Sequence, residues 1–229
     1  MAVVIAFDVN ETLLDLRALD PLFADALGDA ALRPAWFAAM LQLSFVGGLT
    51  GNYVDFTTAQ HAALQMTATR AGREISAPHA DHIVDAMRQL PPHPEVASAL
   101  RQLKDAGLRL TALTNSVLEV AQAQLSNAGL GELVEEVFSA DTVRALKPAP
   151  EPYRMVAQSC QVEIGDVWLV AAHAWDVSGA LAAGCRAAFV ARPGAVPSPL
   201  GPQPDVLGAD VQQVADRLMV SLGVLRAHG

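Results

Sequence analysis

Short apolar runs recur along the chain, each too brief for a typical helix and each followed by polar residues. Val3–Phe7 is the first of them, continuous rather than alternating and rich in β-branched side chains. Such a run is typical of a strand that is buried on both faces of a sheet. Similar runs lie at 108–113, 134–138, 167–172 and 187–190. We therefore predict five strands from these runs.

Helical periodicity separates these runs from residue 93 onwards. In the segment 95–106, Val96, Leu100 and Leu103 share one face, and Gly107 follows as a helix-ending residue. Further helices are predicted over 117–128, 153–159, 177–183 and 211–222, and a surface loop over 195–204. Strands that alternate with helices indicate βαβ units, so we predict an α/β fold with a doubly wound parallel sheet.

Residues between about 15 and 91 interrupt this alternation. They contain no convincing strand and show helical patterns over 19–27, 35–46, 56–71 and 78–90. Pro91, Pro92 and Pro94 then prevent the last helix from continuing. The predicted organisation is an all-helical subdomain, residues 15–91, inserted into a core made of residues 1–14 and 92–229.

Composition narrows the class of protein. With 229 residues and 52% hydrophobic side chains, the chain can bury a large core. Its net charge of −9 and its scattered basic residues argue against a nucleic-acid partner and against an anionic membrane surface. Cys160 and Cys185 are too few for a disulfide framework or a cysteine-based zinc site. The N-terminus lacks the pattern of a signal peptide and no run is long enough to span a membrane, so we expect a cytoplasmic protein.

Reactive side chains follow several of the predicted strands. Asp8 ends the first, Thr114 and Asn115 end the second, and Asp176 comes shortly after the fourth, while Lys147 stands directly before a proline in between. In open α/β sheets, ligands bind outside the carboxyl ends of the strands. We therefore expect these side chains to meet in one site.

This set of residues resembles the haloacid dehalogenase superfamily, and within it the type II (L-)2-haloacid dehalogenases. The resemblance rests on Asp8-x-x-x-Thr12, Thr114-Asn115, Lys147-Pro148 and Asp176. Supporting segments are Leu13 with Asp15, residues 52–56, Tyr153, and Ala174-Trp175-Asp176 with Gly179-Ala180. The resemblance spans nearly the whole chain. It implies a Rossmann-like core with residues 15–91 as a cap, and a homodimer, which the alanine-rich helices permit.

The same resemblance implies roles for the polar residues. Asp8 would be a nucleophile that forms an ester intermediate, which water later hydrolyses. Lys147 would favour the ionised form of Asp8, unless Lys147 is instead a solvated surface charge. Asp176 would orient Lys147 or help to activate water, with a helix N-cap as the alternative. Thr12 and Thr114 would hold the nucleophile or the substrate carboxylate, although threonines also cap helices.

Other residues resemble the part of the family's site that surrounds the substrate. Asn115 resembles the amide that faces the departing halide, and Phe56, Tyr153 and Trp175 resemble its aromatic wall, although aromatics often serve only the core. The expected catalytic set is Asp8, Thr12, Lys147, His173 and Asp176, and the expected substrate-contacting set is Asn10, Phe37, Phe56, Thr114, Asn115, Tyr153 and Trp175.

A missing acid favours carbon–halogen chemistry. The superfamily's phosphatases resemble one another in a second aspartate two residues after the nucleophile, and they bind Mg²⁺. Here that position is Asn10, an amide that delivers no proton; on an extended segment the adjacent Glu11 would point the opposite way. The late loop offers Asp176 alone, whereas a hard cation wants several oxygen ligands. A halide leaves as a stable anion, so we expect metal-free substitution on a small halogenated carboxylic acid, with no cofactor.

Two alternatives remain open from the sequence. One is a Mg²⁺-dependent phosphatase of a small phosphorylated metabolite, supported by the superfamily scaffold alone. The other is a catalytically silent binding protein. The retention of Asp8, Lys147 and Asp176 together argues against the second alternative.

Several positions depart from the pattern of the type II enzymes. The first loop of these enzymes usually has Tyr and Gly at the positions of Asn10 and Glu11. At the position of Phe37 they have an arginine. Losing such a charge-assisted contact costs about 2–3 kcal/mol, or roughly a hundredfold in rate. Arg33, one turn earlier, could compensate or could simply start the helix.

The late loop departs as well. Ala171 and His173 replace the expected Ser and Asn. His173 follows a strand end by two residues, where a water-activating base or an anion-binding imidazolium would be useful. These changes predict a divergent branch with an altered substrate or leaving group.

Overall fold

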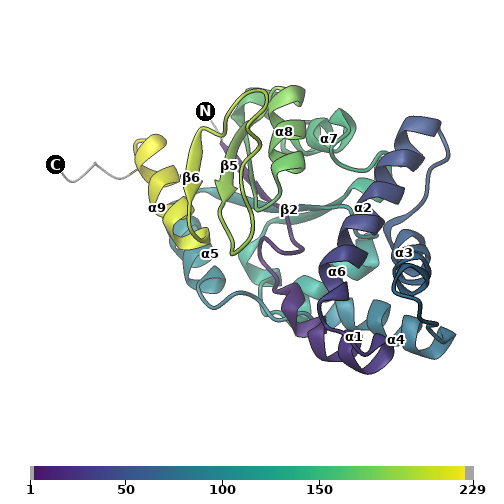
Figure 1. The fold of residues 1–229 in the computed structure, drawn as a ribbon. Helices are drawn as coiled ribbons and strands as arrows, with labels where there is room; N and C mark the ends of the chain where they lie inside the picture. Colours follow the sequence, from purple (N-terminus) through teal and green to yellow (C-terminus); the bar gives the residue numbers. More distant parts are fainter. Residues whose placement is uncertain (1–2, 225–229) are drawn as a thin grey trace.

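Six parallel strands form a single sheet in the order β3-β2-β1-β4-β5-β6 in the computed structural model, which describes residues 3–224. The strands are β1 (Val4–Phe7), β2 (Arg109–Thr114), β3 (Glu136–Ser139), β4 (Val167–Ala171), β5 (Arg186–Val190) and β6 (Val206–Gly208). β1 lies between β2 and β4, so the strand order reverses beside it (Figure 1). This reversal is where open α/β sheets characteristically bind ligands.

The two faces of the sheet bury different side chains of the same strand. In β1, Val4 and Ala6 pack on one side and Ile5 and Phe7 on the other, as the two-residue period of a strand requires. Helices α7 (Pro150–Cys160) and α8 (Ala174–Ala183) cover the first side. The second side is covered by α5 (Val96–Asp105), α6 (Leu118–Asn127) and α9 (Val211–Ser221). The predicted doubly wound parallel sheet is confirmed.

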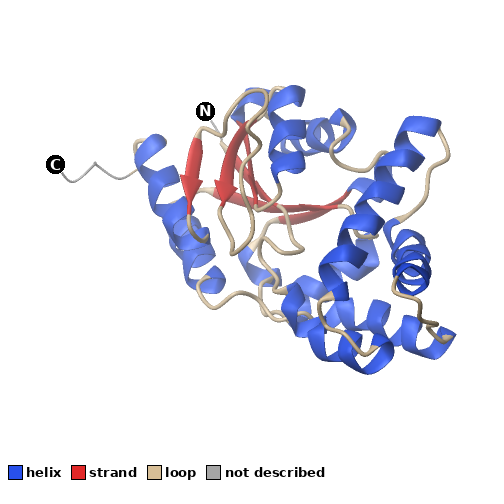
Figure 2. Ribbon diagram, in the orientation of Figure 1, coloured by secondary structure: helices blue, strands red, loops and turns tan. Residues whose placement is uncertain are grey.

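The segment between β1 and α5 is helical. It contains α1 (Asp20–Leu27), α2 (Leu32–Thr50), α3 (Phe56–Arg70) and α4 (Ala77–Ala86). Figure 2 shows these helices gathered beside the body that holds the strands. Short 3-10 turns lie at Leu16–Leu19, Met87–Gln89, Gly131–Leu133, Ala140–Val143 and Ile164–Asp166.

Most element boundaries agree with the predictions to within a few residues. The exceptions have local causes. β6 was not predicted because three residues carry too little periodic signal, and α2 runs beyond the predicted 35–46 at both ends. Residues 195–204 contain no helix or strand, as predicted. Within the described residues, every helix is too short or too polar to traverse a lipid bilayer.

Candidate active site

Asp8 follows β1 directly, in the middle of the sheet. Its backbone N–H donates to the carbonyl of Val170 in β4 at 3.0 Å, which extends the parallel ladder one residue past the strand and fixes where the side chain points. The side chain is almost completely buried. The sheet thus presents one carboxylate at the point where its strand order reverses.

Lys147 is the nearest cation to this carboxylate, and it has no contact with solvent. Its ammonium donates to Oδ1 of Asp8 at 2.9 Å, to Oδ2 of Asp176 at 2.6 Å and to the carbonyl of Leu113 at 2.8 Å. All three N–H donors of the lysine are therefore used. The alternative of a solvated surface lysine is wrong.

The side chain of Asn115 holds the backbone of Lys147. Its Oδ1 accepts from the Lys147 N–H at 2.8 Å, and its Nδ2 donates to the Lys147 carbonyl at 3.1 Å. This pair of bonds ties the end of β2 to the loop that delivers the lysine. Asn115 also lines the cavity beside Asp8, as expected for a residue that faces the halide. Its amide, however, already bonds the backbone of Lys147, which was not expected.

Asp176 lies in the first turn of α8, and its carboxylate is fully buried. The helix begins at Ala174 and its N-cap is His173, so the alternative that Asp176 caps the helix is wrong. One carboxylate oxygen accepts from Lys147, and the other accepts from the hydroxyl of Tyr153 at 2.6 Å. Tyr153 therefore lies behind Asp176, and not in the aromatic wall where the resemblance placed it.

The second oxygen of Asp8 is held by two further side chains. The Thr12 hydroxyl donates to Oδ2 at 2.6 Å, and Nδ1 of His173 lies 3.1 Å from the same oxygen. Thr12 is itself fixed, because its Oγ1 accepts the backbone N–H of Ala172 at 2.9 Å. The carboxylate is thus oriented by partners on both oxygens.

The charges of this cluster stabilise one another. Burial alone would raise the pKa of Asp8, but the charge of Lys147 and the hydrogen bonds from His173 and Thr12 hold it below the ordinary range. Burial would lower the pKa of Lys147, but the carboxylates of Asp176 and Asp8 raise it above its usual value. Asp8 and Lys147 are therefore an ion pair at neutral pH.

His173 carries a second positive charge beside Asp8. Burial lowers its pKa, but hydrogen bonds and the charges of Asp8 and Glu11 outweigh this and raise it to about 9. The ring stacks between Phe37 and Trp175, with centroid distances of 5.7 and 5.1 Å and interplanar angles of 22° and 25°. At neutral pH the group is an imidazolium held in a fixed plane.

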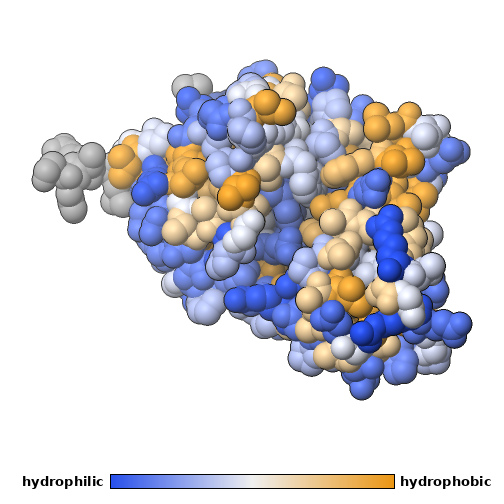
Figure 3. All heavy atoms as spheres, viewed as in Figure 1, coloured by the Kyte–Doolittle hydropathy of each residue, from blue (hydrophilic) through white to orange (hydrophobic). Residues whose placement is uncertain are grey.

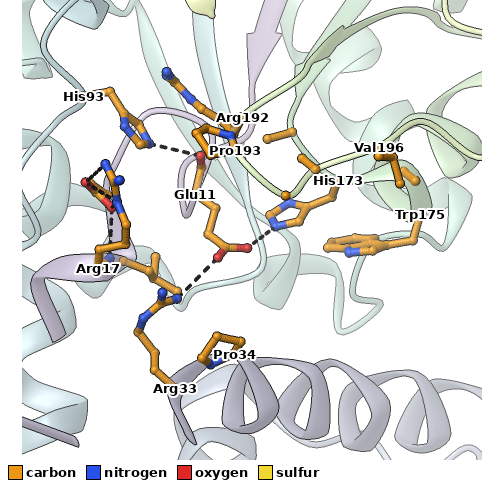
Figure 4. A pocket seen from close by; sticks show the side chains of 16 residues that line it. Glu11, Arg17, Arg33, Pro34, His93, His173, Trp175, Arg192, Pro193 and Val196 are labelled. Carbon is orange, nitrogen blue, oxygen red and sulfur yellow. Dashed lines mark hydrogen bonds and ion pairs between the residues drawn. The ribbon is translucent and has the colours of Figure 1, made fainter. Parts of the chain in front are cut away.

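Glu11 binds the far side of this imidazole. The residue has a left-handed backbone, with φ of 62°, because the chain turns back after Val9. The expectation of an extended segment there is wrong, and Glu11 does not point away from the site. Its carboxylate contacts Nε2 of His173 at 2.9 Å and lies 3.7 Å from Arg33, as Figure 4 shows. Arg33, in the first turn of α2, also pairs with Asp20.

A small cavity of about 10 Å³ lies directly over Asp8. Its lining combines polar residues with apolar side chains from α2, α3 and α8: Asp8, Asn10, Phe37, Leu41, Phe56, Thr114, Asn115, Lys147, His173 and Trp175. This volume is roughly what one water molecule requires. Six of the seven residues expected to contact substrate are in this lining, Tyr153 being the exception.

Two of these residues have polar atoms committed elsewhere. The Asn10 side chain donates to Ser116 Oγ at 3.2 Å and accepts from Gln124 at 2.9 Å. Thr114 Oγ1 accepts the backbone N–H of Ser116 at 3.2 Å, a local turn contact. The following helix α6 has Val117 as its N-cap, so the alternative that Thr114 caps a helix is wrong.

A larger vestibule of about 510 Å³ lies beyond the imidazole. Glu11, Arg33, His93 and Arg192 contribute to its polar wall, as the close view in Figure 4 shows. The space-filling view in Figure 3 is hollowed near the middle of the face that it shows. His173 and Trp175 line both this vestibule and the small cavity. The two side chains therefore separate the reactive carboxylate from the solvent side.

Two residues near the site escaped the sequence reasoning. An extended backbone at Glu11 would point its side chain away from the site, whereas the observed left-handed backbone brings the carboxylate to His173. Arg192 lies two residues after the end of β5, and its guanidinium donates to the Thr12 carbonyl at 2.8 Å and pairs with Glu95 at 2.7 Å. The rule that singled out the other strand ends would also have found Arg192.

The residues present do not suit a divalent cation. Both oxygens of Asp176 accept hydrogen bonds from Lys147 and Tyr153, so this carboxylate has little capacity left for a metal. Across residues 3–224 there is no cluster of three or more His, Cys, Asp and Glu side chains disposed to bind a metal ion.

The whole architecture matches a known family. Residues 3–184 match the family described as haloacid dehalogenase-like hydrolases. The chain belongs to this family. The structure of L-2-haloacid dehalogenase from Xanthobacter autotrophicus with covalently bound chloropropionic acid superposes with a TM-score of 0.88 at 25% identity, over 95% of this chain and 98% of that one.

Curated relatives of this hydrolase agree along most of their length. An (S)-2-haloacid dehalogenase of Pseudomonas sp. (strain YL) is 30% identical over 203 residues, 88% of each chain. Haloacetate dehalogenase H-2 of Moraxella sp. (strain B) is also 30% identical, over 88% of this chain and 91% of its own. This hydrolase is therefore similar to proteins named for carbon–halogen cleavage.

Proposed function

We propose that this hydrolase cleaves the carbon–halogen bond of a short 2-haloalkanoic acid, with Asp8 as the nucleophile. The observation that carries the proposal is an ionised, desolvated carboxylate that faces a small cavity walled by Phe37, Phe56 and Trp175. A relative that holds chloropropionic acid covalently supports the same chemistry.

The first step is a displacement at C2 of the substrate. An oxygen of Asp8 attacks C2, a carbon–oxygen bond forms, and the carbon–halogen bond breaks with its electron pair leaving on the halide. Attack opposite to the leaving group inverts that carbon. Lys147, Thr12 and His173 hold the carboxylate in place, so little reorganisation is needed as the charge moves.

The second step is hydrolysis of the ester. Water adds to Cγ of Asp8, and the products are a 2-hydroxy acid, the restored carboxylate and one proton. Asp176 and Tyr153 act as positioning residues in this scheme, because Asp176 accepts from the ammonium of Lys147, Tyr153 donates to Asp176, and neither touches a reacting atom.

A halide needs no proton to depart, and the site offers none at the usual place. Asn10, two residues after the nucleophile, has its amide bonded to Ser116 and Gln124. A phosphatase would need an acid there and a Mg²⁺ site nearby. The residues around Asp8 therefore favour the dehalogenase over the phosphatase, and we propose that no metal or other cofactor takes part.

The halide site is proposed to differ from that of the relatives. Phe37 replaces a positive side chain with an aromatic ring. The indole N–H of Trp175 is buried and without an acceptor, and the residue lines the cavity. We assign this N–H as a donor to the departing halide.

Residues 15–91 are proposed as the cap over this site, and residues 1–14 with 92–229 as the core. Phe37, Leu41 and Phe56 would then be the cap's contribution to the cavity. A cytoplasmic location and a homodimeric assembly stay predictions from the sequence.

A halide-release assay tests the proposal. Purified protein treated with EDTA is incubated with chloro-, bromo- and fluoroacetate and with 2-chloropropionate, and the free halide is measured beside an Asp8→Asn variant. We expect metal-independent release with at least one acid and none from the variant. Release no greater than that of Asp8→Asn across the set would reject the function, and EDTA-sensitive cleavage of an aryl phosphate would replace it with the phosphatase.

A further inference from the structure

The arrangement around His173 has the parts of a nucleophile–base–carboxylate constellation. We propose that His173 is the general base that activates water for hydrolysis of the Asp8 ester, and that Glu11 is its positioning residue. This inference rests on the proposed function and deepens it, because it assigns the second half of the reaction to a residue pair.

Geometry places the imidazole where such a base must be. Nδ1 of His173 lies 3.1 Å from Oδ2 of Asp8, so a water near that nitrogen would also lie near Cγ of the ester. A general base has to be within hydrogen-bond reach of the proton that it removes, directly or through one water. Thr12 and Lys147 also contact Asp8, but a lysine held between two carboxylates has no free lone pair to accept a proton.

Glu11 determines which nitrogen can accept the proton. Its carboxylate lies 2.9 Å from Nε2 of His173 and therefore keeps a proton on that nitrogen. In the neutral imidazole the lone pair is then on Nδ1, the nitrogen that faces Asp8. Phe37 and Trp175 both stack on the ring, which restricts its motion away from Asp8.

Formation of the ester changes the charge that His173 experiences. Before the reaction its neighbours are the carboxylates of Asp8 and Glu11, with the cations Lys147 and Arg33 beyond them. The ester of Asp8 is neutral, so one of the two charges that raise the pKa of His173 disappears while burial continues to lower it. The imidazolium thus becomes more acidic once the first step is complete.

The proton balance of the second step follows. After alkylation the imidazolium loses its Nδ1 proton to solvent, and the neutral ring then accepts a proton from the attacking water. The water oxygen bonds to Cγ, the bond between Cγ and the substrate oxygen breaks, and that oxygen takes the proton back from His173. The carboxylic acid of Asp8 then returns its proton to Nδ1, which restores the ion pair.

The position of His173 between the two cavities suits this exchange. The imidazole lines both the small cavity over Asp8 and the vestibule, and Glu11 lines the vestibule. A water that enters from the vestibule therefore meets His173 on its way to the ester. Figure 4 shows Glu11 and the imidazole side by side at this boundary.

Rapid-mixing measurements with bromoacetate test the assignment. They compare the wild type with His173→Asn, Glu11→Gln and Glu11→Asp. His82→Gln is the control, because it alters an exposed histidine. We expect His173→Asn to keep a stoichiometric burst of bromide but to lose roughly 10²–10⁴-fold in steady-state rate. Intact-mass analysis should then show the ester on Asp8. Glu11→Gln should accumulate less ester than His173→Asn does, and it should shift the pH profile of hydrolysis. Glu11→Asp should bring the ester level and the pH profile part of the way back to those of the wild type.

The outcomes separate the two levels of the proposal. If the wild-type protein releases no halide, the proposed function fails. If it does, a His173→Asn variant that keeps the wild-type steady-state rate, or that turns over without accumulating the ester, overturns the base assignment alone. Thermal melting checks that each variant folds. Should His173→Asn not fold, the ester level and pH profile of Glu11→Gln decide, and a wild-type pH profile in that variant counts against the inference.

Discussion

Lys147 is the residue on which the charge balance of the site depends. Its ammonium is buried among two carboxylates and a carbonyl and has no surface exposed to solvent. A buried ion pair is weak evidence for stability by itself, but removing one partner leaves an uncompensated charge. The same lysine therefore supports folding and keeps the carboxylate of Asp8 ionised.

Lys147→Met tests this dual role, because it keeps most of the volume and removes the charge. We expect the free energy of unfolding to fall by about 3–5 kcal/mol and halide release to be lost. Urea titration followed by circular dichroism measures the first quantity. Lys104→Met, at an exposed lysine, is the matched control, and equal unfolding midpoints for the two variants would contradict the prediction.

The raised pKa of His173 predicts a pH-dependent stability. Its folded-state pKa of about 9 exceeds the ordinary 6.5, so the stabilisation is fully present below 6.5 and is lost as the pH rises through about 9. This loss is on the order of 3 kcal/mol. Unfolding free energies should therefore drop more steeply across this window for the wild type than for His173→Asn. If the unfolding free energies of the two proteins change with pH in parallel, the charges of Asp8 and Glu11 do not stabilise the imidazolium.

For single residues, the sequence predicted the place of some side chains in the site but not of others. Asp8, Lys147 and Asp176 were found because parallel strands bring their carboxyl ends to one edge, whatever the detailed geometry. Glu11 was not, because a left-handed backbone at a residue other than glycine leaves no mark in the sequence. The bonds from Asn115 to the Lys147 backbone depend on how two loops meet, which a linear pattern does not encode.

Among the elements, α8 packs closely against Pro148 and Tyr153 beside the site. Gly179 allows this approach: a Cβ there would lie 2.5 Å from Cβ of Pro148 and 2.7 Å from the hydroxyl of Tyr153. The helix therefore fixes the loop that carries Lys147 as well as supplying Asp176.

Gly179→Ala should push α8 away from that loop. We expect a loss of about 1–3 kcal/mol in stability, because overpacking has to be relieved by backbone shifts, and a reduced kcat, because Lys147 moves with Pro148. Gly48→Ala is the control: Gly48 is exposed in α2 with open space around its Cβ, so alanine should stabilise by about 0.5–1 kcal/mol. Thermal melts and halide assays of both variants compare them, and a stabilised Gly179→Ala would refute the tight packing.

The elements themselves were largely predictable because buried strands and amphipathic helices have distinct periods. The errors lie where that signal is weak. The start of α8 at Ala174 was placed late, since Ala174 and Trp175 continue the apolar character of the preceding strand run. The strand β6 lies at the edge of the sheet, where it pairs with β5 alone, and its three residues are too few to be recognised from the sequence.

Across the whole molecule, one continuous apolar cluster joins the sheet to the helical segment. Phe7 of β1 and Trp168 of β4 belong to the same cluster as Trp36 of α2 and Leu64 of α3. The helices at 16–89 therefore do not bury their apolar faces among themselves alone. The insertion was predictable from the break in strand–helix alternation, but this shared core was not, because contacts between distant segments depend on the assembled fold.

This shared core predicts a single cooperative unfolding transition. Trp36 lies in the helical segment and Trp168 in the sheet, so tryptophan fluorescence reports on both parts. Fluorescence and far-ultraviolet circular dichroism should give superimposable denaturation curves. Two separated transitions would show instead that the helices and the sheet unfold independently.

The chamber above Asp8 is smaller than any haloalkanoic acid, since its 10 Å³ suffice for about one water molecule. Such an acid fits only when side chains that line the chamber move apart, and Phe37 and Leu41 of α2 line it together with His173 and Trp175. Bulkier acids demand a wider excursion, so the enzyme should discriminate among substrates through the frequency of opening as well as through the contacts made once it has closed.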